Sequence, residues 1–417
     1  MNNLLQNVKL LGSESPWLSR LRQSGSSAFK EQGFPSAKTE AWKYTKLREL
    51  KSKDFIISQT TSDTTAIELP FDCYKICFEN GWFCPSSSNL PQGVEVIPLI
   101  EAILFHPELH NYICKLANIN THPFVALNQA YLQEGVFIKI EKNVNIKKPL
   151  AIISHTEGSD INLLFNLRNI IVLDENSAAT VVEYHTYSGD TKSGYLANIV
   201  NEIYLASNAN LQHYKVQDEA FKANHIAFSA VSQNRCSKYQ SFCLQRGANI
   251  GRNETLVQLK DEGAETEINA AYLMDGWATL DTTTNVEHLA PHTYSHQLIK
   301  GVVSGNAKGV FQGKIHIAPN AIGTEGNQLH KALLLSDNAE VDVKPELEIY
   351  ADDVKCSHGA ASGELDEEQL FYMRSRGIGI EEAKQLLIDA YLDEITTKID
   401  NEKISQWIKL ITQENRR

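Results

Sequence analysis

A thiol and an imidazole lie two residues apart in the last quarter of the chain, in Cys356-Ser357-His358. In an extended strand, residues i and i+2 share one face and lie about 6.6 Å apart. Cysteine sulfur and histidine nitrogen are ligand types that suit iron, zinc and copper. Two ligands do not close a metal site, so a partner chain or a substrate would have to complete it. A packed cysteine beside a hydrogen-bonded histidine is the alternative that the spacing leaves open.

Three further histidines, His288, His292 and His296, are spaced four residues apart. A helix would align their imidazoles, but Pro291 and the β-branched residues around it exclude that helix. In a strand, four residues span ~13 Å, which is too far for one metal ion to bridge. We therefore expect separate structural histidines here.

Cys73, Cys77 and Cys84 form a similar loose group. A strand would place Cys73 and Cys77 ~13 Å apart, and no second ligand pair follows, so the pattern does not indicate zinc. Adjacent Asp352 and Asp353 would face opposite sides of a strand, so they cannot act as paired carboxylates. We interpret these two acids as caps of a turn.

Other catalytic motifs are absent from the sequence. It contains no Gly-x-x-x-x-Gly-Lys-Ser/Thr loop for ATP hydrolysis and no Gly-x-Ser-x-Gly nucleophile elbow. We therefore expect neither phosphate-loop ATP hydrolysis nor hydrolase chemistry that uses such an elbow.

The composition narrows the class of protein. The 417 residues carry a net charge of −12 without a basic run, which disfavours a nucleic-acid partner. No stretch of 18 apolar residues occurs, so we expect no membrane span. The N-terminus does not read as a signal peptide, and the seven scattered cysteines do not suggest a disulfide framework. We therefore expect a cytoplasmic protein with reduced thiols.

Short runs of alternating polarity dominate residues 121–363. Phe311, Gly313, Ile315 and Ile317 share one face, for example. Between such runs lie similar corners, which are Ser207-Asn208-Ala209, Arg246-Gly247-Ala248, Glu262-Gly263-Ala264, Gly305-Asn306-Ala307, Pro319-Asn320-Ala321 and Asp337-Asn338-Ala339. Asn and Gly tolerate the left-handed backbone of a tight corner, and Ala fits the bend after it. Because about 240 residues of short strands are long for a sandwich, we predict a mainly β protein with a right-handed parallel β-helix core.

The two ends differ from this core. Residues 1–120 read as a mixed, largely helical domain, with a helix that starts at Ser15-Pro16 and a hairpin over Phe71–Phe83 around Asn80-Gly81. Residues 364–417 read as a C-terminal helical domain.

The helices of this C-terminal domain have recognisable boundaries. Asp366-Glu367-Glu368 opens one helix and Gly377 ends it. A second begins at Glu381-Glu382 with an apolar face.

Three blocks of sequence resemble a known family. The first is Ser336–Ala360, which contains Lys-Cys-Ser-His-Gly-Ala, together with Leu365–Ile378 after it. The second is Pro35–Leu47, which contains Lys-Thr-Glu-Ala-Trp-Lys-Tyr-Thr. The third is Lys300–Val302 with Val310–Ile315. Together they closely resemble the SufB/SufD family of iron–sulfur cluster assembly proteins of the SUF system, over essentially the whole chain. The chain length and the Cys-Ser-His-Gly-Ala form are more similar to the SufD branch than to the SufB branch.

The resemblance implies a scaffold subunit of a SufB–SufC–SufD complex that is not itself an enzyme. It implies a β-helix that pairs with SufB and C-terminal helices that dock the ATPase SufC, which binds the ATP. It further implies that His358 faces SufB and helps to hold a transient iron–sulfur cluster, with Cys356 as the weaker candidate ligand. No cofactor is expected on this chain alone, and a homodimer of the isolated chain stays open.

Two alternatives and one departure accompany this interpretation. The alternatives are a SufB-type paralogue that carries the main cluster site and a β-helix carbohydrate-active enzyme. The departure is Gln328-Leu329-His330, where the family usually has Gln-x-Asn. The resemblance therefore does not predict the local conformation of this turn of the β-helix.

Overall fold

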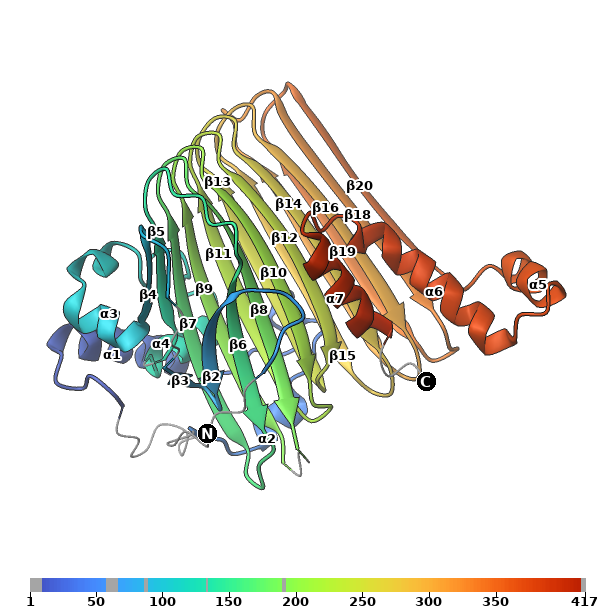
Figure 1. Cartoon of the computed structure of the whole chain (residues 1–417), viewed down its shortest axis with the longest axis horizontal. Coiled ribbons are helices and arrows are strands. Elements are labelled where there is room, and N and C mark those ends of the chain that lie inside the picture. The colour runs from blue at the N-terminus through green and yellow to red at the C-terminus, as the bar shows by residue number, and fades with distance from the viewer. Residues whose placement is uncertain (1–9, 58–66, 86–88, 133, 190–192, 414–417) are drawn as a thin grey trace.

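The computed structural model describes residues 10–57, 67–85, 89–132, 134–189 and 193–413. Two ten-stranded sheets, here sheet A and sheet B, face each other along the molecule (Figure 1). Sheet A runs in the order β19 (Glu340–Ile349), β17 (Lys308–Ile317), β15 (Thr279–His288), β13 (Ile250–Leu259), β11 (Asn224–Gln233), β9 (Tyr195–Leu205), β7 (Leu163–Leu173), β5 (Val136–Ile140) and β4 (Val94–Pro98), and β1 (Ile56–Ile57) pairs with β7. Sheet B runs β20 (Val354–Gly363), β18 (Thr324–Leu334), β16 (Tyr294–Val303), β14 (Glu265–Met274), β12 (Lys238–Gly247), β10 (Asn210–Glu219), β8 (Ala178–Ser188), β6 (Leu150–Glu157), β2 (Tyr74–Glu79) and β3 (Trp82–Cys84).

The chain alternates between the sheets, so each turn adds one strand to each. Leu163 lies beside Tyr195 and Asn224 beside Ile250, so a turn takes roughly 30 residues, within the range of solenoid repeats. From β5 onward every strand pairing between turns is parallel. The predicted parallel β-helix is confirmed, and an antiparallel sandwich is excluded.

The backbone conformation at the corners explains why Asn residues occur there. Asn176 and Asn208 adopt left-handed backbone with φ of 57° and 59°. The Asn208 side-chain amide donates to the Asn176 side-chain oxygen at 3.0 Å, and Asn176 donates to that of Asn143 at 2.9 Å. The alanines that follow such corners, including Ala209 and Ala307, are fully buried. Among the predicted corners, Asn208, Gly247, Gly263 and Gly305 have positive φ, whereas Asn320 and Asn338 do not. The left-handed interpretation is therefore confirmed for four of the six corners and wrong for the other two.

Helices of the N-terminal region pack against the start of the solenoid and along the outer face of sheet A. They are α1 (Pro16–Gln32), η1 (Glu40–Trp42), α2 (Arg48–Ser52), α3 (Leu99–Phe105), η2 (Pro107–Asn111) and α4 (Pro123–Ala130). Ser15 caps α1 through its hydroxyl, which accepts the Leu18 N–H, as the sequence predicts.

The predicted hairpin is also present. β2 and β3 pair antiparallel around Asn80 and Gly81, whose φ angles of 49° and 81° suit a tight turn. β2 also pairs in parallel with β6, so the hairpin forms the first edge of sheet B.

Candidate functional site

Cys356 and His358 lie on β20, the last strand of sheet B. Cys356 pairs with Gly326 and His358 with Gln328 in the parallel register to β18. Gln328 is 2% exposed and points into the solenoid, as do its even-numbered neighbours on β18. Because residues in register share a face, Cys356 and His358 both face the interior. The prediction that they share one face is confirmed.

The solenoid is open beyond these residues. No described strand pairs with the outer edge of β19 or β20. His358 is therefore exposed although it faces inward, while Cys356 is half-buried against Ile315, Leu347 and other residues of the last turns. Burial raises the pKa of the Cys356 thiol, and the Gly326 backbone N–H offsets part of that rise. At neutral pH this thiol stays protonated until a metal or another cation displaces the proton.

These two residues do not complete a metal site within the described chain. The one group of three ligand atoms close enough to share an ion, among the described residues, is Glu95, His106 and Glu108 near the start of the solenoid. Glu108 also forms an ion pair with Lys139 at 2.7 Å. Any metal at Cys356 and His358 would need ligands from outside this chain.

A polar row continues inward beneath His358. Gln328 stacks on Gln297 of β16, and both side chains are buried. The Gln328 amide has no hydrogen-bond partner among the described residues. The sequence analysis did not predict this row. The fact that alternate residues of a strand share a face was the signal that could have suggested it for Gln328 and His358.

His330 fits the same interior. Its Nε2 lies 2.8 Å from the Tyr272 hydroxyl, and its ring stacks on Phe311 with centroids 5.1 Å apart. Burial lowers the pKa of His330 to about 4, so the ring is neutral at pH 7. This histidine is a packed rung residue rather than a ligand.

The three spaced histidines separate as expected. His288 is buried between the Thr293 and Ser295 hydroxyls, each at 2.8 Å. His292 occupies a left-handed corner with φ of 53°, and His296 is exposed on the outer side of β16. No single ion can reach all of them.

The aspartate pair lies in the bend before β20. Asp352 and Asp353 are exposed, and the Asp353 carbonyl accepts the Gly323 N–H at 2.7 Å. This arrangement fits the turn interpretation and does not provide acids stacked across rungs for glycoside cleavage.

The cysteines near residue 77 form a pair that the linear spacing concealed. Cys77 and Cys84 lie directly opposite each other across the β2–β3 hairpin, whereas Cys73 lies just before β2, four residues from Cys77. Among the described residues, none of the three belongs to a group of metal ligands.

The C-terminal helices are α5 (Glu367–Ser375), α6 (Ile380–Thr396) and α7 (Glu402–Gln413). The Asp366 carboxylate caps α5 by accepting the Glu368 and Gln369 N–H groups at 2.9 and 3.1 Å. Gly377 follows α5 with φ of 90°. Both predicted boundaries are confirmed.

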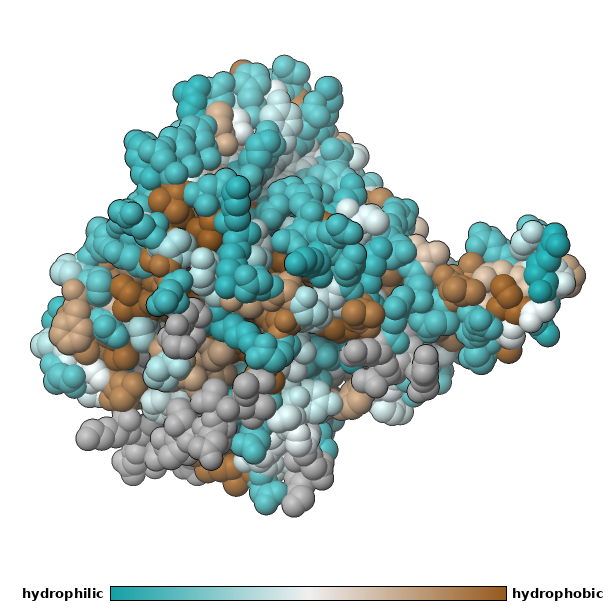
Figure 2. Space-filling model, in the orientation of Figure 1, coloured by the Kyte–Doolittle hydropathy of each residue, from teal (hydrophilic) through white to brown (hydrophobic). Residues whose placement is uncertain are grey.

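α6 and α7 lie across the outer face of sheet B, while α5 projects away from it (Figure 1). Lys300 of β16 anchors α6: its ammonium donates to the Tyr391 carbonyl at 2.6 Å and pairs with Glu394. α5 buries no residue, and Phe371 and Tyr372 are 73% and 59% exposed. Figure 2 shows apolar side chains along this projection. Exposed aromatic side chains on a helix that extends from the body are typical of a docking element.

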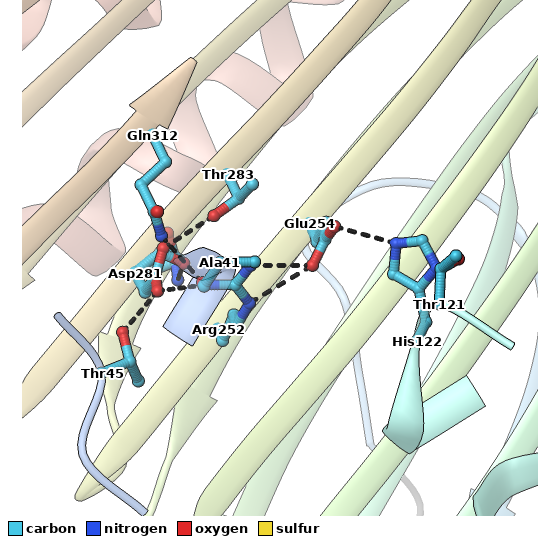
Figure 3. A network of polar contacts seen from close by, with 10 residues as sticks. Ala41, Thr45, Thr121, His122, Arg252, Glu254, Asp281, Thr283 and Gln312 are labelled. Carbon is cyan, nitrogen blue, oxygen red and sulfur yellow. Dashed lines mark hydrogen bonds and ion pairs between the residues drawn. The ribbon is translucent and has the colours of Figure 1, made fainter. Parts of the chain in front are cut away.

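The Pro35–Leu47 block packs on the outer face of sheet A, where part of it surrounds a buried ion network (Figure 3). Arg252 of β13 pairs with Glu254 at 2.9 Å and with Asp281 of β15, and the Trp42 ring lies 4.3 Å from its guanidinium carbon. The Thr45 hydroxyl donates to Asp281. The block therefore serves to attach the N-terminal segment to the solenoid.

None of the helices in the described part of the chain is long and apolar enough to cross a membrane.

Comparisons with known proteins agree with this architecture. Residues 5–152 match the family model "SufBD protein N-terminal region", and residues 155–391 match "SUF system FeS cluster assembly, SufBD core domain".

Several curated proteins are similar over most of their length. The chain is 32% identical to an iron–sulfur cluster assembly SufBD family protein of Synechocystis sp., over 95% of this chain and 90% of that one. It is 33% identical to the iron–sulfur cluster assembly protein SufD of Escherichia coli, over 90% and 88%. It is 27% identical to SufD of Bacillus subtilis, over 76% and 72%. With its parallel β-solenoid and helical ends, the chain belongs to the SufBD family of iron–sulfur cluster assembly proteins of the SUF system.

Proposed function

We propose that this chain is the SufD-type scaffold subunit of a SufB–SufC–SufD complex in the cytoplasm, without catalytic activity of its own. Relatives named SufD match it over most of both chains. The proposed division is an N-terminal domain over 1–120, the β-helix over 121–363 and an ATPase-docking domain over 364–417.

The open end of the solenoid is the proposed SufB surface. The outer edges of β19 and β20 carry backbone groups that another parallel strand could pair with. Val341, Val343 and Leu347 face inward on β19 and are only partly buried, so they would gain cover from a partner. A homodimer of the isolated chain would use this same edge when SufB is missing.

The single observation that carries the cluster assignment is the position of His358 and Cys356, side by side on the inward face of this open end. An imidazole nitrogen is a common ligand of iron in proteins. A cluster needs at least three more ligands, which SufB would supply, and the cluster is a product held transiently. Cys356 is the weaker candidate because burial raises the pKa of its thiol.

The test is His358→Ala in the complete complex. We expect a folded subunit and an intact complex that no longer forms clusters in cells, read from iron and sulfide content and from the visible spectrum. His296→Ala is the matched control, because it removes an exposed histidine from the outer face of the neighbouring part of sheet B. Cys356→Ser should have a smaller effect. If His358→Ala forms clusters at the level of His296→Ala, the cluster-site assignment of His358 is wrong and only the scaffold role of the chain remains.

The projecting helix α5 is the proposed centre of the SufC contact. Its exposed Phe371 and Tyr372 can be changed without touching the core, since α5 buries no residue. We expect Phe371→Ser with Tyr372→Ser to reduce co-purification with SufC at least tenfold, which equals about 1.4 kcal/mol. Leu410→Ser is the control, because Leu410 is 56% exposed on α7. Equal co-purification of both variants would place the ATPase contact elsewhere.

Deleting the chain from Asp366 onward is the coarser form of this test. It should abolish SufC binding while the β-helix stays folded.

A further inference from the structure

The hairpin at the first edge of sheet B brings two thiols together. Cys77 of β2 and Cys84 of β3 are cross-strand partners, two pairs away from the Asn80-Gly81 turn. Directly opposite residues of an antiparallel pair have Cα atoms about 4.5 or 5.5 Å apart, according to the hydrogen-bonding position. Both values lie inside the range of about 4.4–6.8 Å that disulfides span.

The two side chains also face the same way. Opposite residues of an antiparallel pair share a face, so the Sγ atoms of Cys77 and Cys84 lie on one side of the hairpin. Cys77 packs at the margin of the apolar cluster beneath α7, which includes Phe71 and Trp407. Cys73 lies just before β2, four residues from Cys77 along the chain, and it is not the cross-strand partner of Cys84.

We propose that Cys77 and Cys84 are a reversible redox pair that closes to an intramolecular disulfide under oxidising conditions. The oxidant is a low-molecular-weight disulfide such as oxidised glutathione. One cysteine thiolate attacks a sulfur of that disulfide and releases one glutathione thiol. The second cysteine thiolate then attacks the mixed disulfide and releases the other, so two protein thiols are oxidised and one small disulfide is reduced to two thiols.

The bond should be easy to reduce again. Cβ atoms of opposite residues lie about 4.5–5.5 Å apart, whereas a relaxed disulfide needs about 3.5–4.5 Å, so closure draws the strands together. Strained disulfides have more oxidising potentials and are the labile ones. The Cys84 thiol would also give up its contact with the Trp82 carbonyl at 3.6 Å.

The rate should depend on pH in a defined direction. Burial raises the pKa of the Cys77 thiol, and the neighbouring Cys84 adds to that rise. The thiolate fraction is therefore small at pH 7 and grows about tenfold per pH unit up to the pKa. Oxidation should accelerate by the same factor between about pH 7 and pH 8.5.

The experiment uses the full-length chain with Cys236→Ser, which removes the exposed thiol. The reduced protein is equilibrated in glutathione buffers of rising oxidised share, alkylated, and analysed by peptide mass spectrometry and by a thiol count after denaturation. We expect the loss of two thiols, a peptide cross-linked between Cys77 and Cys84, and full recovery on return to reduced glutathione.

Single-site controls decide the assignment. Cys77→Ser and Cys84→Ser should each abolish the loss of two thiols, whereas Cys73→Ser should retain it. The proposal is overturned if the thiol count does not fall, if the cross-link joins another pair, or if glutathione remains attached as a mixed disulfide without closure.

Discussion

Replacing Arg252 by methionine tests how the N-terminal block is attached to the solenoid. The Arg252 guanidinium is fully buried and pairs with Asp281, which is also fully buried, and with Glu254, which is 17% exposed. Methionine keeps much of the side-chain volume, so the change removes charge rather than bulk. Removing one partner of a buried pair costs about 3–5 kcal/mol, and the partial exposure of Glu254 favours the lower value.

We therefore expect Arg252→Met to lower the free energy of unfolding by about 3 kcal/mol. At about 2.1 cal/mol/K of unfolding entropy per residue, this corresponds to a fall in Tm of about 3 °C for the 417 residues. The assay combines calorimetry with hydrogen exchange of residues 40–47, since Trp42 and Thr45 lose their contacts to this network. Exchange in that segment should rise more than in the solenoid.

The pH dependence adds a second test of the same cause. Burial by itself would raise the pKa of Glu254, but Arg252 and then His122 outweigh burial and lower it to about 2, from an ordinary value of 4.5. A carboxylate with a lowered folded pKa stabilises the fold above its unfolded pKa, and that contribution is lost as pH falls through the folded value. In Arg252→Met the contribution of Arg252 to this lowering is gone and only that of His122 remains, so the carboxylate protonates more readily. The stability gap between wild type and variant should be largest near pH 7 and narrow between about pH 5 and pH 2.

Two comparisons make the result decisive. Arg235→Met removes a surface pair with Glu262, 3.5 Å apart and with side chains 61% and 46% exposed, and should cost at most about 0.5 kcal/mol. Adding Asp281→Asn to Arg252→Met should recover part of the loss, because it removes a buried charge that the first change leaves unpaired. If Arg252→Met unfolds at the same temperature as Arg235→Met, the reasoning about this network is refuted.

Two further predictions concern the body of the protein. Lys300→Met should loosen α6, because the fully buried Lys300 ammonium binds the Tyr391 carbonyl and Glu394. Hydrogen exchange in residues 380–396 should therefore increase. Lys331→Met should leave this exchange unchanged, because it removes only a 3.6 Å surface contact to the same Glu394. His330→Asn should lower the free energy of unfolding, measured with denaturant, by about 1–2 kcal/mol, because it loses the stacking on Phe311 and leaves a gap beside Tyr272. A stability at or above that of the wild type would contradict the packing role of His330.

Much of the local structure follows from the sequence alone. Alternating polarity predicts strands because side chains alternate across a strand, and Asn or Gly before Ala predicts corners because few other residues adopt left-handed backbone. The caps at Ser15 and Asp366 and the hairpin at Asn80-Gly81 follow from equally local rules. The shared face of Cys356 and His358 is likewise a consequence of their spacing. All of these are properties of a few consecutive residues.

What the tertiary structure decided is which residues lie beside each other across turns. Parity shows that Cys356 and His358 share a face, but only the register with Gly326 and Gln328 shows that this face is the interior. Their exposure depends on β20 being the last strand of its sheet, which no local pattern reveals.

The attachment of the N-terminal segment has the same origin. Thr45 and Asp281 are 236 residues apart in the chain. They are in contact only because the N-terminal segment packs on the outer face of sheet A beside β15. Rungs of unequal length shift the register from turn to turn, so such contacts depend on the summed geometry of the whole stack rather than on any one segment.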